Sequence, residues 1–170
     1  MKKSAVFLIV PRSRKQCVFL PSGDPYSERE ERVALVTGGH KYQMIIEDFK
    51  WFEERLKFYK ITTVRHGAAD GVDSDVERWC KANYYRTDPN PVTPEEWNKH
   101  RNAKTGKSYA GLLRNTKMAE KPPKPVVCLA FTGAKGTLHM IETARKFEIP
   151  VEESPERFVT ALAVAQTFHF

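Results

Sequence analysis

Cysteine is scarce in this chain, and long apolar runs are missing. The three cysteines, Cys17, Cys80 and Cys128, are odd in number and lack the spacing of a metal site. We therefore expect buried, reduced thiols, as in a cytoplasmic protein, and neither a disulfide framework nor a metal centre. No apolar run approaches the ~18 residues that a membrane-spanning helix needs, so no membrane partner is predicted.

A secretory signal peptide is not indicated either. The N-terminus, MKKSAVFLIVPRSRK, starts with basic residues, but its apolar part is only about six residues long. Pro11, Arg12 and Arg14 then stand where a signal peptide carries small residues before its cleavage site. We therefore expect a protein that stays in the cytoplasm. Internal repeats and low-complexity tracts are also missing, so no repeat architecture is predicted.

The composition is typical of a globular domain with a basic surface. The chain has 170 residues, of which 41% are hydrophobic and 29% are charged, enough for one domain with its own core. Its formal net charge of +7 favours anionic partners. A nucleotide, a nucleic acid and an acidic protein all fit this charge, as does a plain lysine-rich surface. Charge alone does not select among them.

The pattern divides the chain into an N-terminal extension and one main domain. Residues 1–31 contain two short apolar runs, Ala5–Val10 and Gln16–Leu20, which flank a turn-forming segment and predict a β-hairpin. Residues 32–170 show strand and helix patterns in alternation. This alternation predicts a parallel sheet with helices on both faces and right-handed crossovers, an α/β fold of the Rossmann-like kind.

Hydrophobic periodicity locates the individual elements. The predicted strands are Val33–Val36, Ile61–Val64, Tyr84–Thr87, Val126–Phe131 and Ile149–Val151. The predicted helices run from Ile45 to Tyr59, Ser74 to Tyr84, Gly111 to Ala119 and Leu138 to Phe147, with a proline-rich loop over residues 88–97 and a helix start at Thr93. Asp73 is expected to cap the second helix, and Ser154 to start a last helix. Residues 158–170 fit a strand equally well.

Glycines follow three of the predicted strands. They are Gly38 and Gly39 after the first strand, Gly67 after the second, and Gly133 after the strand that begins at Val126. In a parallel sheet the carboxyl ends of the strands lie at one edge, where ligands bind. A shared ligand cleft therefore explains the three turns better than three unrelated tight turns.

The turn from Gly133 to Thr137 joins a buried strand to a helix. The first amides of a helix lack intrahelical partners, and the helix dipole adds partial positive charge there. Gly133 and Gly136 permit close approach of a phosphate, and Thr137 adds a hydroxyl. The alternative is a turn that needs glycine only for its shape. The anion-binding interpretation requires a cavity beside residues 133–137.

Four blocks of the sequence resemble one known family. The blocks are TGGHKY (37–42), HGAADGVD (66–73), AGLLRNTKM (110–118) with Trp97 before it, and FTGAKGT (131–137) followed by Met140 and Ala144. In this order they are similar to the YspA/YpsA-related branch of the SLOG superfamily, Rossmann-like nucleotide-binding proteins. The resemblance covers most of the chain, residues 32–152. It implies a phosphate-bearing, nucleotide-derived ligand, no further cofactor, no metal, and a homo-oligomer.

The resemblance also implies which residues contact that ligand. They are Gly38, Gly39, His40, His66, Gly67, Arg114, Asn115, Gly133, Ala134, Lys135, Gly136 and Thr137. Arg114 offers a planar fork to a phosphate, and Asn115 can both donate and accept hydrogen bonds. For His66 a purely structural role is an equal alternative, and Trp97 is expected to pack in the core.

The chain departs from the family pattern at three positions. His40 and Asp70 stand where arginines are usual, and Ala134 replaces the second glycine of the phosphate turn. An alanine is tolerated there only if the backbone avoids a glycine-only conformation. These changes predict an altered ligand preference or a weakened site.

A fourth departure bears on catalysis. The lonely guy relatives cleave nucleoside monophosphates with a glutamate after the phosphate turn, where this chain has Met140. A thioether cannot do the work of a carboxylate, and Glu142 should face away on the helix. Asp70 or Asp73, from another loop, could replace the glutamate, and the catalytic candidates are Asp73 and Arg114. For Asp73 the alternative is that it only caps its helix.

The favoured function is therefore binding of a nucleotide-derived ligand by a sensor, sequestering or regulatory protein. The first alternative is an N-glycosidic hydrolase that resembles the nucleoside-monophosphate phosphoribohydrolases. The second is binding of single-stranded nucleic acid through the basic block from Lys99 to Lys117, in which Tyr109 and the preceding Trp97 supply stacking surface.

Overall fold

The computed structural model describes residues 30–155 of the chain, which divides after Glu30. The expected hairpin in residues 1–31 and the helix or strand expected after Pro155 lie outside the described residues. Within residues 30–155 no helix is long and apolar enough to cross a membrane. Cys80 and Cys128 are buried and unpaired as expected, and burial raises the pKa of both thiols to about 12.

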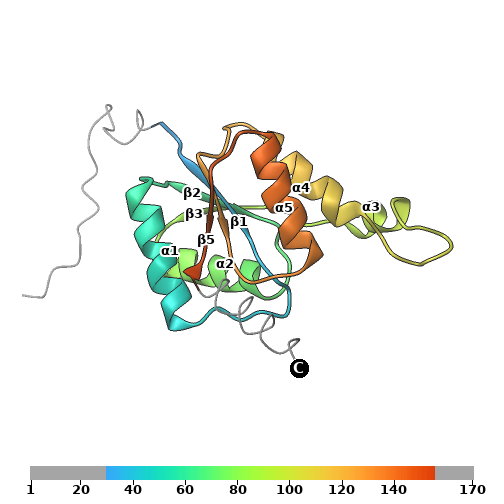
Figure 1. Ribbon diagram of the computed structural model, residues 1–170, viewed down its shortest axis with the longest axis horizontal. Coiled ribbons are helices and arrows are strands. Elements are labelled where there is room, and N and C mark those ends of the chain that lie inside the picture. Colours follow the sequence, from blue (N-terminus) through green and yellow to red (C-terminus); the bar gives the residue numbers. More distant parts are fainter. Residues whose placement is uncertain (1–29, 156–170) are drawn as a thin grey trace, which may run out of the picture. The chain divides into compact units, whose positions relative to one another are not determined.

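The core of the fold is a five-stranded, all-parallel sheet in the order β3-β2-β1-β4-β5 (Figure 1). Its strands are β1 (Val33–Thr37), β2 (Thr63–His66), β3 (Arg86–Pro89), β4 (Val127–Ala130) and β5 (Val151–Glu153). The predicted α/β Rossmann-like fold is confirmed. The strand order reverses between β1 and β4, and such a switch point opens a crevice at the carboxyl ends of the strands.

Helices cover both faces of this sheet. They are α1 (Ile46–Phe58), α2 (Val72–Ala82), α3 (Pro94–Lys99), α4 (Ala110–Glu120) and α5 (Lys135–Lys146). Ala34 and Val36 of β1 pack in one cluster with α1 and α2, whereas Leu35 packs in the other with α4 and α5. The strand is therefore buried on both sides, which is why its sequence is continuously apolar.

The starts of two helices differ from the predictions. Helix α2 begins at Val72, after Gly71 with a φ of 72° at the N-cap position, so Asp73 lies in the first turn and the prediction that it caps the helix is wrong. Helix α5 begins at Lys135 rather than Leu138. The first turns of both helices therefore reach further toward the sheet edge than apolar periodicity indicated.

The prediction that residues 88–97 form a loop is also partly wrong. Asp88 and Pro89 belong to β3, where they pair with Arg65 and His66 of β2. Proline is tolerated because β3 is an edge strand, whose outer side needs no ladder hydrogen bonds. From Pro94 the chain is helical, as the capping pattern at Thr93 predicted.

A buried arginine ties the sheet to helix α4. Arg65 is only 1% exposed, and its Nε donates to Oδ2 of Asp88 at 2.7 Å. Its Nη1 donates to the carbonyls of Met118 at 2.9 Å and Lys121 at 2.6 Å. The last carbonyls of a helix lack intrahelical donors, and the Arg65 guanidinium donates hydrogen bonds to these two carbonyls instead. Arg65 therefore fixes the C-terminal end of α4 against β2 and β3.

We expect Arg65→Met to destabilise the fold by about 3 kcal/mol, because Asp88 and the α4 carbonyls lose their buried donor. Urea unfolding measures this loss. Arg86→Met is the control, since Arg86 is an exposed arginine on the neighbouring strand. Its effect should stay within about 0.5 kcal/mol. Similar losses in the two variants would contradict the role of Arg65.

Candidate functional site

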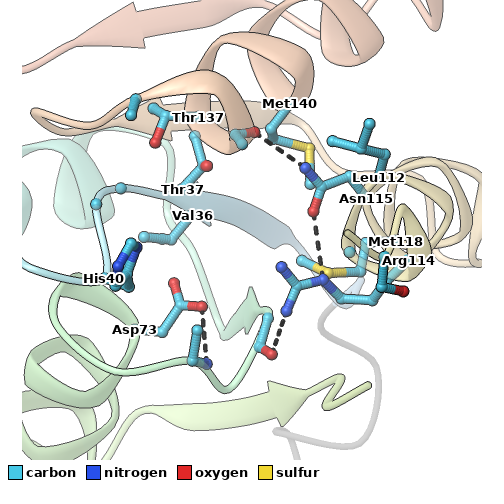
Figure 2. A pocket seen from close by; sticks show the side chains of 18 of the residues that line it. Val36, Thr37, His40, Asp73, Leu112, Arg114, Asn115, Met118, Thr137 and Met140 are labelled. Atoms are coloured by element: carbon cyan, nitrogen blue, oxygen red, sulfur yellow. Dashed lines mark hydrogen bonds between the residues drawn. The ribbon is translucent and has the colours of Figure 1, made fainter. Parts of the chain in front are cut away.

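A cavity of about 220 Å³ opens at the carboxyl ends of the strands, beside the switch point between β1 and β4 (Figure 2). Most of the predicted site residues line it: Gly38, Gly39, His40, Gly67, Asp73, Arg114, Asn115, Ala134, Gly136 and Thr137. The remaining lining residues were not predicted to contact a ligand: Val36, Thr37, Ala69, Trp97, Ser108, Gly111, Leu112, Met118 and Met140. The cavity required beside residues 133–137 is thus present.

The N-terminus of α5 presents free amides to this cleft. The first hydrogen bond of the helix runs from Leu138 N to Ala134 O at 3.1 Å, and the N-cap residue, Ala134, has no capping side chain. The amides of Lys135, Gly136 and Thr137 precede that bond and have no acceptor among residues 30–155. Together with the helix dipole, they make this end of the cleft suitable for an anion.

Two threonine hydroxyls add to this polar floor. The side chains of Thr37 and Thr137 both line the cleft, and the residues are 7% and 2% exposed. Neither hydroxyl is hydrogen-bonded within the part of the chain that the structure describes, and neither oxygen is fully shielded from solvent. Both hydroxyls are therefore free to donate to or accept from a polar ligand.

The glycines of the site serve two different purposes. A Cβ on Gly133 would overlap Oγ1 of Thr137, and one on Gly38 would overlap the side chain of Val72, so these glycines allow close packing of loops. At Gly136 and Gly111, in the first turns of α5 and α4, a Cβ would meet nothing within 4 Å. These two helical glycines keep the cleft open.

A chain of hydrogen bonds crosses the cleft and holds Arg114 (dashed in Figure 2). Nη1 of Arg114 donates to the carbonyl of Gly67, and its Nε donates to Oδ1 of Asn115 at 3.3 Å. Nδ2 of Asn115 donates to the carbonyl of Gly136 at 3.1 Å. A Cβ on Gly67 would overlap the guanidinium, so this glycine is what admits Arg114 to the cleft.

Asp73 places a buried carboxyl group on another wall. It is 7% exposed, its Oδ2 accepts a hydrogen bond from the amide of Ala69 at 3.1 Å, and Figure 2 shows it directed into the cavity. Burial raises the pKa of Asp73, against the opposing effects of the Ala69 amide, His66 and Arg114. The cleft therefore contains a carboxyl group that holds its proton more tightly than an exposed aspartic acid.

Three predicted contact residues do not line the cleft. His66 is 1% exposed, with Nε2 2.7 Å from Oε2 of Glu77 and Nδ1 accepting from the Ala68 amide at 3.2 Å. Both of its nitrogens are engaged, which fits the structural role. Gly133 lies behind Thr137, and Lys135 is exposed outside the cleft.

The rim of the cleft is apolar and aromatic. Trp97 is 48% exposed and Leu112 is 38% exposed, so the expectation that Trp97 packs in the core is wrong. Met140 lines the cleft, and Glu142 is exposed outside it. The site thus combines a polar, buried floor with an apolar mouth.

No protein-family model, curated protein or solved structure matches this chain. Within residues 30–155 there is also no cluster of three or more histidine, cysteine or acidic side chains that could hold a metal ion.

The raised pKa of Asp73 predicts a specific pH dependence of stability. A carboxyl group whose pKa is higher in the folded protein than in the unfolded chain binds its proton more tightly when folded. Folding stability then falls as the pH rises from the ordinary aspartate pKa, about 3.9, through the raised value. We expect Asp73→Asn to raise the unfolding temperature at pH 7, and the gain to vanish near pH 3.

Thermal unfolding of the two proteins between pH 3 and pH 8 tests this expectation. Asp70→Asn is the control, because Asp70 is exposed on the same loop and outside the cleft. It should show no comparable gain at pH 7. A lower unfolding temperature for Asp73→Asn at pH 7 would contradict the assignment.

Proposed function

We propose that this protein binds a nucleotide or nucleotide-derived ligand through its phosphate at the N-terminus of α5. The observation that carries the proposal is the pair of unpaired amides of Gly136 and Thr137, two residues that line an open cavity. A phosphate can accept hydrogen bonds from such amides and gains from the helix dipole. The formal charge of +7 adds long-range attraction for an anion.

The other walls suit the remaining parts of a nucleotide. Arg114 lines the cleft with a guanidinium that two hydrogen bonds already hold in place, so little side-chain entropy is lost when it contacts a phosphate. Trp97 and Leu112 offer an apolar surface for a base at the mouth. The cavity of about 220 Å³ is smaller than pockets that enclose drug-sized ligands, so part of the ligand stays at the mouth.

Binding without chemistry is the role that the site supports best. Met140 leaves the cleft without a carboxylate at the position that the lonely guy relatives use for catalysis. We therefore favour a cytoplasmic sensor, sequestering or regulatory protein. One observation favours N-glycosidic hydrolysis as a second candidate: the carboxyl group of Asp73 and the guanidinium of Arg114 line the same cleft. Release of free base from AMP, followed by chromatography, distinguishes the two functions.

AMP and inorganic phosphate are the probes that test binding. At a concentration 100-fold above its dissociation constant, AMP should stabilise the folded protein by about 2.7 kcal/mol in thermal unfolding. Gly136→Asp should weaken binding of both probes at least about tenfold, because it places a negative charge in the anion site. The variant should fold, since nothing lies within 4 Å of the new Cβ and an acidic residue suits the first turn of a helix.

Leu138→Asp is the matched control. It adds the same charge to the same end of α5, but Leu138 is 49% exposed and does not line the cleft. This variant should bind AMP like the natural protein. Failure of both AMP and phosphate to stabilise the protein would refute the proposal. Salt-sensitive binding of a single-stranded oligonucleotide, equal in Gly136→Asp, would instead favour the nucleic-acid alternative.

A further inference from the structure

Asp73 gives the cleft a second pole, whose chemistry is opposite to that of α5. An ionised carboxylate only accepts hydrogen bonds, and it repels a phosphate. The amides at the start of α5 only donate hydrogen bonds. A ligand that satisfies both poles must therefore carry an anionic group at one end and hydrogen-bond donors at the other.

The carboxylate has spare acceptor capacity for such a donor, because its two oxygens offer about four lone-pair sites. Oδ2 of Asp73 accepts from the Ala69 amide at 3.1 Å, and a hydrogen bond from the Gly67 amide also favours the ionised carboxylate. The loop behind it is braced, because the Ser74 hydroxyl donates to the Ala69 carbonyl at 3.0 Å and a Cβ on Gly71 would overlap the Gly39 carbonyl. Asp73 is thus held in place before any ligand arrives, which favours selective recognition.

Burial indicates which part of a nucleotide reaches Asp73. The aspartate and Thr137 are 7% and 2% exposed, so both lie on the buried floor of the cleft. Trp97, at 48% exposure, lies at its mouth. If the phosphate occupies the floor at α5 and the base stacks at the mouth, the group that remains on the floor is the pentose. Its hydroxyls are the donors next to the phosphate.

We propose that Asp73 accepts hydrogen bonds from the 2′- and 3′-hydroxyls of a ribose, so that the cleft selects ribonucleotides over 2′-deoxyribonucleotides. This inference rests on the proposed function, since it assumes that the phosphate binds at α5. A deoxyribose leaves the buried carboxylate without one donor, and an unpaired buried charge disfavours binding. The selectivity should appear in the sugar phosphate alone, without any base.

The test compares ribose 5-phosphate with 2-deoxyribose 5-phosphate by calorimetry at pH 7. The natural protein should bind the ribose compound at least about tenfold more tightly, in line with one hydrogen bond to a charged group. In Asp73→Asn the two sugars should bind within about threefold of each other, and inorganic phosphate should bind no more weakly than before. Asp70→Asn, which removes an exposed carboxylate from the same loop, should retain the full preference.

Each outcome decides a different claim. Equal binding of the two sugars to the natural protein, or an unchanged preference in Asp73→Asn, would overturn the inference and leave phosphate binding at α5 intact. The inference would also be overturned if Asp73→Asn changed only the preference for AMP over inosine monophosphate. The donor to Asp73 would then be the amine of the base. If no phosphate compound binds, the proposed function fails together with the inference. Near-ultraviolet circular dichroism confirms that the variants are folded.

Discussion

The contact between the loops after β1 and β4 is the constraint on which the site depends. The Gly39 amide donates to the Thr132 carbonyl at 2.8 Å, and a Cβ on Gly133 would lie 2.8 Å from the Gly39 nitrogen. Only glycine allows the two loops to approach this closely. The approach brings the first turn of α5 to the crevice at the switch point, where Gly136 and Thr137 line the cavity.

The opposite wall is fixed by polar contacts in addition to the packing of α4 in the core. Arg65 holds the C-terminal end of α4 against β2 and β3, and Arg114 and Asn115 join the middle of the same helix to Gly67 and to Gly136. Helix α4 is therefore braced at both the sheet and the phosphate turn. A ligand that bonds Arg114 does not have to order it, which lowers the entropic cost of binding.

The fold and much of the cleft could be predicted from the sequence, for physical reasons that differ between elements. Strands β1 and β4 could be predicted because they are buried on both faces and carry unbroken apolar runs. Strand β3 was predicted two residues too early, at Tyr84–Thr87, because it is a partly exposed edge strand with no apolar pattern to fix its ends. The role of Arg65 depends on carbonyls 53 residues away, a contact that no local pattern encodes.

Two of the departures from the SLOG pattern that the sequence resembles do not weaken the proposed anion site. Ala134 has a φ of −102°, a conformation open to any residue, so the lost glycine causes no strain at the phosphate turn. Asp70 is exposed and does not line the cleft, so its charge is screened by solvent before it can repel a phosphate there. Asp73 is the carboxylate that the proposed ligand would meet in the cleft. The same burial that makes its charge costly would also make a hydroxyl donor valuable, so the proposed selectivity for the sugar and the raised pKa of Asp73 share one physical cause.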